Sequence, residues 1–163
     1  MNLYVIRHAI AEAPGTKPDS QRTLTAKGRG KMRKIACGLN TLGVRLDLIL
    51  TSPYVRACET AGILADEFRL SADRIIKTPH LALDSSPDRL IEEVIALYGE
   101  TKNLALVGHE PFLSELVSVL LTGTPDLQVN FRKGGACALT VETLCNGRCA
   151  VLEWLLTPSQ LAD

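Results

Sequence analysis

The chain has 163 residues, enough for one domain that buries about two thirds of the surface of its unfolded state. Its 18 basic and 18 acidic side chains balance, so no global charge favours binding to nucleic acid or to an anionic membrane. Arg7 follows the first residue too closely to leave room for a signal-peptide core, and the apolar run 113–121 is too short to span a bilayer. We therefore expect a single cytoplasmic domain over residues 1–163.

The first half of the chain alternates strand and helix patterns. Residues 2–6 form a short apolar run and predict a buried strand. After a polar loop, apolar side chains recur at helical spacing over residues 32–42, with Thr25 suited to cap the helix and Gly43 to end it. Residues 47–50 predict the next strand.

Two Ser-Pro pairs mark the starts of further helices, because serine caps a helix and proline fits its first position. The pair at 52–53 predicts a helix whose first turn contains Arg56. Glu59 lies three residues further on, where an ion pair with Arg56 on the helix surface is the expected arrangement. The pair at 86–87 predicts a helix that ends at Gly99.

The second half of the chain adds a strand, a helix and a hairpin. Residues 103–107 predict another buried strand, and a helix with an apolar face follows the next proline. The pair Asn146-Gly147 is typical of a type I′ turn and predicts a hairpin of residues 136–144 and 149–156. This order predicts an α/β fold: a three-layer α/β/α sandwich with a mostly parallel central sheet, an antiparallel strand and a C-terminal hairpin.

The five cysteines are odd in number and scattered, which argues against a disulfide framework. Cys145 and Cys149 flank the predicted turn one ladder rung apart, so their side chains should point to opposite faces. A zinc site needs more ligands than this pair offers, and no histidine is near. We expect neither a metal nor a cofactor.

Each of three predicted strands is followed by side chains that can hold or attack a phosphate. These are Arg7 and His8 after the first strand, Arg56 after the second, and His109 after the third. Ligands bind at the carboxyl ends of the strands in an open, mostly parallel sheet, so these residues should meet at one edge. The sequence therefore predicts a phosphate site there.

The segments around these residues resemble the histidine phosphatase superfamily, whose fold is phosphoglycerate mutase-like. Residues 3–12 resemble its Arg-His-Gly signature, and residues 20–28 resemble its Arg-x-Leu-Thr-x-x-Gly segment. Residues 51–61 are similar to its Ser-Pro-x-x-Arg-Ala-x-x-Thr-Ala helix, and residues 107–111 to its second histidine motif. The blocks occur in family order, and the small size of the chain resembles the SixA branch, the bacterial phosphohistidine phosphatases.

The resemblance implies a phosphatase in which His8 attacks phosphorus and becomes a phosphohistidine that water hydrolyses. It implies that Arg7 and Arg56 hold the phosphoryl oxygens with planar donor forks, and that Arg22 borders the pocket. His109 would donate a further hydrogen bond, and the sequence leaves open whether it is protonated. A histidine attacks only when it is neutral, and the cations beside His8 disfavour its protonation.

Two positions depart from the family pattern. The third signature residue is usually Gly and is Ala9 here, so its φ should be negative and one methyl group must fit beside the nucleophile. Residues 81–88 lack the glutamate motif with which larger members of the superfamily protonate the leaving oxygen. Asp84 and Glu110 are the candidates for that acid and for contact with the substrate.

The absence of the usual glutamate motif affects which substrate we expect. An imidazole, whose conjugate acid has a pKa of about 6.5, can leave as a neutral ring, whereas an alkoxide leaves poorly without a proton. This favours phosphohistidine on a signalling or phosphotransfer protein over a sugar phosphate. Two alternatives stay open: a small-molecule phosphomonoesterase, with Asp84 or Glu110 as its acid, and a non-catalytic module that binds phosphoproteins. The oligomeric state is not determined by the sequence.

Overall fold

The computed structural model describes residues 1–15 and 17–162, and its strands and helices alternate along most of the chain. The strands of this part of the chain are β1 (Asn2–Arg7), β2 (Leu48–Thr51), β3 (Ile75–Lys77), β4 (Asn103–Gly108), β5 (Ala136–Val141) and β6 (Ala150–Leu156). The helices are α1 (Ala26–Thr41), α2 (Val55–Phe68), α3 (Pro87–Tyr98), α4 (Phe112–Thr122) and α5 (Pro158–Ala162), with short 3-10 turns η1 (Asp19–Gln21), η2 (Ala72–Arg74) and η3 (Pro79–Leu81).

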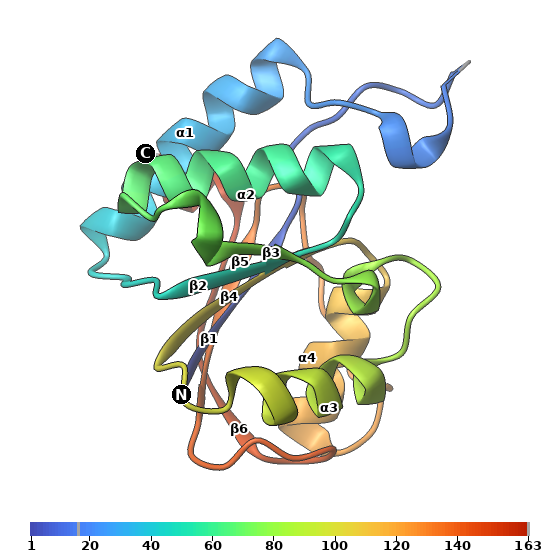
Figure 1. Cartoon of the computed structure of the whole chain (residues 1–163), viewed down its shortest axis with the longest axis vertical. Coiled ribbons are helices and arrows are strands. Elements are labelled where there is room, and N and C mark those ends of the chain that lie inside the picture. The colour runs from blue at the N-terminus through green and yellow to red at the C-terminus, as the bar shows by residue number, and fades with distance from the viewer. Residues whose placement is uncertain (16, 163) are drawn as a thin grey trace.

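The strands form one sheet in the order β3-β2-β4-β1-β5-β6 (Figure 1). Strands β3, β2, β4 and β1 run parallel to one another, and β5 and β6 continue the sheet as antiparallel neighbours. The predicted α/β fold with a mostly parallel sheet is thus confirmed. Because Arg7 at the end of β1 pairs with Gly108 at the end of β4, the carboxyl ends of these strands lie at the same edge.

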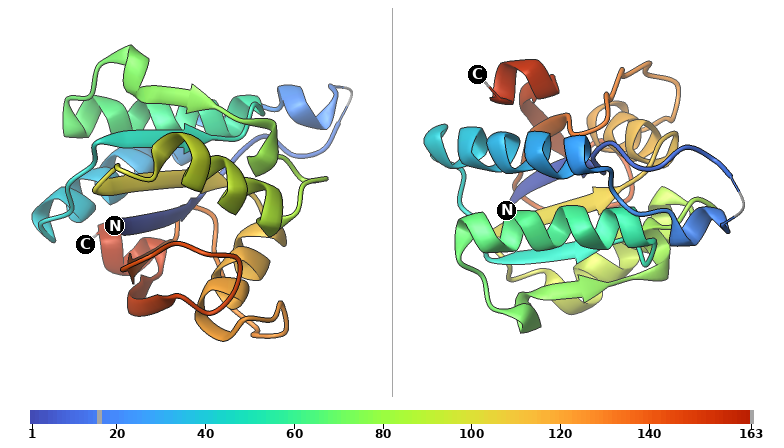
Figure 2. Two further views of the ribbon diagram at one scale, coloured as in Figure 1. Left: turned by 60° about the horizontal axis from the view of Figure 1, so that its bottom comes forward. Right: turned by 90° about the horizontal axis from the view of Figure 1, so that it is seen from above.

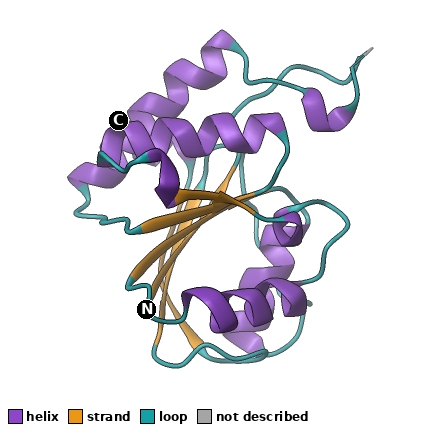
Figure 3. Ribbon diagram, in the orientation of Figure 1, coloured by secondary structure: helices purple, strands orange, loops and turns teal. Residues whose placement is uncertain are grey.

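Helices cover both faces of the sheet, which makes the three layers that Figure 3 shows. Alternate side chains of β1 point to opposite faces: Leu3 and Val5 pack with α3 and α4, whereas Ile6 packs with α1, α2 and α5. Figure 2 shows α1 and α2 side by side on their face. Within the described ranges, no helix is both long and apolar enough to cross a membrane.

The predicted boundaries of α1 are confirmed in detail. The Thr25 hydroxyl accepts a hydrogen bond from the Gly28 backbone N–H at 2.9 Å, as an N-cap does. A Cβ at Gly28 would lie only 2.0 Å from the backbone oxygen of Ile10, so the close contact between α1 and the segment after β1 requires glycine there. Gly43 has a φ of 81° and ends the helix.

Two local predictions are wrong. Helix α2 begins at Val55 rather than directly after Ser52, whose hydroxyl accepts from the Tyr54 N–H at 3.3 Å. Strand β5 ends at Val141 and β6 begins at Ala150, so residues 142–149 form a long loop instead of a two-residue turn. A type I′ turn needs positive φ at both central residues, and Arg69 is the one described non-glycine residue with positive φ.

The two cysteines of this loop are therefore not partners across a ladder. Cys149 Sγ lies 3.4 Å from the backbone oxygen of Cys145, so both residues belong to one turn of the loop. Cys149 is half-buried and its pKa is raised by burial. The prediction that their side chains point to opposite faces of a sheet is wrong, because Cys145 lies outside both strands.

Candidate active site

His8 directly follows β1 at the carboxyl edge of the sheet and is only 6% exposed. Its Nδ1 lies 2.8 Å from the backbone oxygen of Ala9. A carbonyl oxygen can only accept, so this nitrogen carries the proton of the neutral ring and donates it. Nε2 then keeps its lone pair, and it accepts a hydrogen bond from Nε of Arg56 at 3.2 Å. The backbone thus selects the tautomer in which Nε2 is the nucleophilic nitrogen.

The surroundings of His8 also keep it neutral. Burial lowers the pKa of His8 to about 4, although the hydrogen bond to Ala9 opposes the shift. The charges of Arg56, Arg7 and Lys133 lower the pKa further. His8 is therefore unprotonated near neutral pH, which is the state in which an imidazole can attack phosphorus.

Arg56 is in the first turn of α2, as predicted, and is 3% exposed. Its Nε donates to His8, and its other nitrogens donate to Asp19: Nη1 to the backbone oxygen at 2.6 Å and Nη2 to Oδ2 at 2.8 Å. Thr60 ties the helix to the strand end, because its hydroxyl accepts from the Ala9 N–H at 3.1 Å and donates to the Arg56 oxygen at 2.7 Å. The guanidinium is thus fixed against the ring of His8.

Arg7 ends β1, and its Nη1 donates to the backbone oxygen of Phe131 at 2.6 Å. Its Nε is buried and has no hydrogen-bond partner among the described residues. Burial lowers the pKa of Arg7, but a guanidinium stays charged at neutral pH. A buried, unpaired donor on a charged group is rare, and it leaves an N–H free for an anion.

His109 directly follows β4 and is 1% exposed. Its ring centroid lies 5.0 Å from that of His8, and its Nε2 is 2.8 Å from the Ser52 hydroxyl. The same hydroxyl accepts from the Tyr54 N–H, so its own hydrogen is free to be donated to Nε2. This arrangement favours a proton on Nδ1 of the neutral ring, and Nδ1 is a second buried nitrogen without a partner in the described part of the chain.

Burial lowers the pKa of His109 to about 3, and the neighbouring charges act mostly in the same direction. His109 is therefore a neutral hydrogen-bond donor rather than a cation. The structure thus brings all four residues of the predicted phosphate site together, with two orphaned donors among them, on Arg7 and His109.

The three remaining predicted site residues differ in position. Arg22 is at the rim, where its Nε donates to Oδ1 of Asp19 at 2.8 Å. Glu110 is half-buried, burial raises its pKa against the opposing charge of Arg7, and its Oε1 is buried without a described partner. Asp84 is exposed and makes no hydrogen bond or ion pair with any residue of the described ranges. Only the first two of the three are thus tied to the site.

Sequence reasoning missed Asp19 and misplaced Glu59. Asp19 is three residues before Arg22, a spacing that suits an ion pair but does not reveal the contact with Arg56. Glu59 does not pair with Arg56: its carboxylate accepts from the Leu24 N–H at 2.6 Å and forms an ion pair with Arg29. The helix turns Arg56 inward to His8 and Asp19, so an ion pair on the helix surface is not available.

The alanine in the third signature position is accommodated. Ala9 is 3% exposed and packs in the core under α1 and α2, and its φ is not positive. The expectation of negative φ with room for one methyl group is confirmed. Ala9 contributes to the site through its backbone oxygen, which accepts the hydrogen bond from Nδ1–H of His8.

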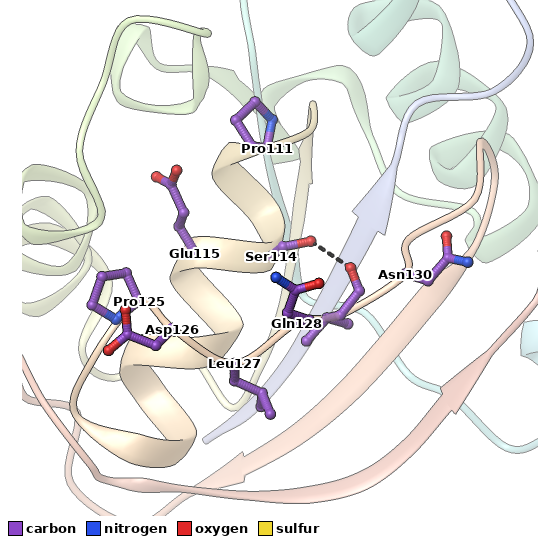
Figure 4. A pocket seen from close by; sticks show the side chains of 9 residues that line it. Pro111, Ser114, Glu115, Pro125, Asp126, Leu127, Gln128 and Asn130 are labelled. Carbon is purple, nitrogen blue, oxygen red and sulfur yellow. Dashed lines mark hydrogen bonds between the residues drawn. The ribbon is translucent and has the colours of Figure 1, made fainter.

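A surface hollow of about 670 Å³ lies beside the predicted site, along α4 (Figure 4). Pro111 and Ser114 form one wall, and residues 125–130 form the other. The Ser114 hydroxyl donates to the backbone oxygen of Val129 at 2.9 Å, shown by the dashed line in Figure 4. The hollow is therefore a neighbour of the four central residues and is not lined by them.

The arrangement defines a class of protein. A neutral histidine held against arginine forks at the carboxyl edge of an α/β sheet is suited to phosphoryl transfer, where charge on the phosphoryl oxygens must be neutralised. In the described ranges, no group of three histidine, cysteine or acidic side chains is placed to hold a metal ion.

Comparisons with known proteins identify the family. The model of the histidine phosphatase superfamily (branch 1) matches residues 3–82. The chain is 33% identical to the phosphohistidine phosphatase SixA homolog of Haemophilus influenzae over 74% of this chain and 77% of that protein. It is 26% identical to phosphohistidine phosphatase SixA of Escherichia coli over 99% of this chain and 96% of that protein. A solved structure of the protein histidine phosphatase SixA complexed with tungstate has a TM-score of 0.85 at 26% identity and 99% coverage of both chains.

The chain therefore belongs to the histidine phosphatase superfamily, in its SixA-type branch, and is a phosphatase.

Proposed function

We propose that this phosphatase removes phosphate from phosphohistidine on a protein and forms a covalent phosphohistidine on its own His8. The observation that carries the proposal is the state of His8: Nδ1–H is held by the Ala9 oxygen, and Nε2 is unprotonated beside Arg56. A pKa of about 4 keeps this state at neutral pH. The ring is thus in the tautomer that attack requires, and the Nε–H of Arg56 must move from Nε2 to a phosphoryl oxygen when the substrate binds.

In the first step, the lone pair of His8 Nε2 attacks phosphorus, and the electron pair of the breaking P–N bond returns to the departing imidazole. The charges of Arg7 and Arg56 stabilise the phosphoryl oxygens in the transition state. The orphaned N–H groups on Arg7 and His109 supply the further donors that such oxygens need. Tungstate, bound by a relative in its solved structure, is an oxyanion of the same shape as phosphate and supports this use of the site.

In the second step, water attacks the phosphorus of phospho-His8. The P–Nε2 bond breaks, its electrons return to Nε2, and the water proton passes to solvent or to the released phosphate. The same arginines neutralise the oxygens again, so one set of donors serves both steps. His8 keeps its Nδ1 proton throughout, because the Ala9 oxygen accepts it in either state.

Phosphohistidine on a cytoplasmic signalling or phosphotransfer protein is the substrate that we propose. The named SixA relatives support it, and so does the exposed position of Asp84, which argues against that residue as an acid for esters. The hollow beside α4 leaves room for the surface of the substrate protein that surrounds its phosphohistidine side chain.

A small-molecule phosphomonoesterase is the second candidate, and one observation favours it. Burial raises the pKa of Glu110, and a carboxylic acid that holds its proton can protonate an ester oxygen. Its buried Oε1 has no hydrogen-bond partner among the described residues. The two candidates differ in the leaving group that they release, so substrate preference separates them.

The test compares a phosphohistidine protein, a sugar phosphate and an aryl phosphate as substrates, with and without a metal chelator. We expect the highest kcat/KM for the phosphohistidine protein and no effect of the chelator. The His80→Ala variant is a matched control for His8, since His80 is half-buried on η3 and its side chain makes no described hydrogen bond. Faster turnover of the sugar phosphate would favour the second candidate, and binding without turnover of any substrate would contradict both.

A further inference from the structure

Asp19 is the one acidic residue whose oxygens bind the arginine that contacts His8, among the residues the structure describes. Oδ2 and the backbone oxygen accept from Arg56 at 2.8 and 2.6 Å, and Oδ1 accepts from Nε of Arg22 at 2.8 Å. Every acceptor of the residue is thus bonded to a guanidinium. The carboxylate is fixed in place even though the side chain is 47% exposed.

The charge of this carboxylate is equally fixed. Slight burial raises the pKa of Asp19, but hydrogen bonds from Arg56 and Arg22 outweigh it and hold the pKa below its ordinary value. Asp19 is therefore an anion near neutral pH. It can accept a hydrogen bond from a substrate, but it cannot give a proton to an alkoxide.

Its exposed position at the rim makes it accessible to a leaving group. The guanidinium of Arg56 directs Nε to His8 and its other nitrogens to Asp19, so this single planar group separates the carboxylate from the nucleophile. Attacking and leaving atoms lie in line across phosphorus, so the leaving group departs on the side away from His8. An exposed carboxylate on the far side of Arg56 is accessible to a ring presented by another protein.

The imidazole of His8 and the imidazole of the substrate both need a hydrogen-bond acceptor at the nitrogen that does not carry phosphorus. A phosphorylated ring leaves as neutral imidazole only if its other nitrogen carries a proton, and an acceptor at that nitrogen favours the protonated form. For His8 the acceptor is the Ala9 oxygen at 2.8 Å. The donor ring needs an equivalent acceptor, because its conjugate acid, with a pKa of about 6.5, is largely deprotonated near neutral pH.

We propose that Asp19 determines the specificity of the enzyme for phosphohistidine by accepting a hydrogen bond from the distal N–H of the departing imidazole. The inference rests on the proposed function and names the group that selects its substrate. In the step, the P–N bond of the substrate breaks and its electrons return to that nitrogen. The distal proton stays on the ring, which leaves neutral, while His8 Nε2 forms the new P–N bond with its lone pair.

Glu110 is less suited to this role. Its Oε2 is in hydrogen-bond contact with the Ser114 hydroxyl, its Oε1 is buried, and burial raises its pKa. A carboxyl group with a buried oxygen and a pKa raised by burial is a poorer acceptor for a ring that enters from solvent. Asp19 has the opposite properties: it is exposed, ionised and held by two arginines.

The test is the substrate preference of the Asp19→Asn variant, which keeps the size and one oxygen of the side chain. The kcat/KM for a phosphohistidine protein should fall about 10- to 100-fold, the range for loss of a hydrogen bond to a charged group. The kcat/KM for p-nitrophenyl phosphate, whose phenolate leaves without a proton, should fall by a clearly smaller factor, which measures the weaker support of Arg56 alone. Asp19→Glu should recover part of the preference.

A pH profile separates recognition of the ring from simple support of Arg56. The loss on phosphohistidine should shrink at acidic pH, where the donor ring is protonated without help, and grow at alkaline pH. Asp73→Asn is the matched control, because Asp73 also pairs with an arginine, Arg74, but on the η2 turn before β3, at the far edge of the sheet. It should leave both substrates and both profiles unchanged.

Equal losses on both substrates in Asp19→Asn would show that Asp19 only holds Arg56, and unchanged rates on both would show no role; either result overturns the inference. A wild-type enzyme that does not hydrolyse phosphohistidine overturns the proposed function, and the inference with it. An active wild type whose preference survives in Asp19→Asn overturns the inference alone.

Discussion

The inner wall of the site and its rim are built by different forces. On the inner wall, His8, Arg56 and His109 are between 1% and 6% exposed and stand at strand ends or in the first turn of α2. On the rim, Asp19 and Arg22 lie in or beside η1 and are held by ion pairs. Burial therefore fixes the chemistry of the wall, whereas charge pairing fixes the geometry of the rim.

The difference decides what each part can do. Burial lowers the pKa of both wall histidines and leaves donors on Arg7 and His109 unpaired, which suits a reaction on a desolvated phosphoryl group. Ion pairs on the rim keep a carboxylate charged while it stays accessible to solvent. We expect changes in the wall to reduce all activity and changes at the rim to alter the choice of substrate.

Removal of the nucleophile is the strongest way to test the wall. His8→Ala should lower turnover of every substrate on the order of 10⁴-fold or more, because it removes the nucleophile that forms the covalent intermediate. The fold should persist, since His8 follows β1 and is not part of its packed face. Turnover assays with circular dichroism measure both, and His80→Ala should retain wild-type rates. Comparable rates in His8→Ala would contradict the mechanism.

Lysine in place of Arg7 or Arg56 should have the next largest effect. Arg7→Lys and Arg56→Lys should each lower kcat about 100-fold, because an ammonium group cannot replace a planar fork on phosphoryl oxygens. Arg74→Lys, in an exposed ion pair with Asp73, is the control and should be neutral. A rise in KM with kcat unchanged would mean that these arginines bind the ground state and do not stabilise the transition state.

The depressed pKa of His8 should make the fold sensitive to acid. Between pH 6.5 and about 4, the unfolded chain takes up a proton at this residue that the folded protein excludes, so the free energy of unfolding falls as pH falls. His8→Gln should therefore lose about 2 kcal/mol less stability than the wild type between pH 7 and pH 5. Urea unfolding at both pH values measures this difference, and equal losses in the two proteins would contradict a buried neutral ring.

The smallest effects should come from the acidic candidates. Asp84→Asn together with Glu110→Gln should change phosphohistidine hydrolysis by less than about threefold, because the departing imidazole carries its own proton. The same pair of changes should cost on the order of 100-fold on an alkyl phosphate if either residue is a general acid. Efficient hydrolysis of an alkyl phosphate by the wild type, lost in this variant, would promote the small-molecule phosphatase.

The wall could be predicted from the sequence because its parts are repeated local patterns. A short apolar run followed by His or Arg identifies a strand end, and parallel strands bring their ends to one edge, as β1 and β4 do at Arg7 and Gly108. The rim could not be predicted, since the contact of Asp19 with Arg56 depends on the path of a loop that has no periodic pattern.

The other errors have similar causes. Strand β3 has three residues and α5 has five, too few to show a period in the sequence. The pair Asn146-Gly147 suggested a tight hairpin, but the chain makes a wider loop in which Asn146 does not have the positive φ of that turn. The i, i+3 spacing predicts an ion pair of Glu59 with Arg56, but α2 packs so that Glu59 pairs with Arg29 instead.

The most direct test of the account is a rapid-quench experiment with a protein that carries radioactive phosphohistidine. Mixed with excess enzyme, it should transfer its phosphate to the enzyme within a single turnover, in an acid-labile and base-stable form that peptide mapping assigns to His8. The His8→Ala enzyme should carry no label, and His80→Ala should match the wild type. Release of phosphate with no labelled enzyme at any time, or with the label on another residue, would contradict the central claim that His8 is the nucleophile.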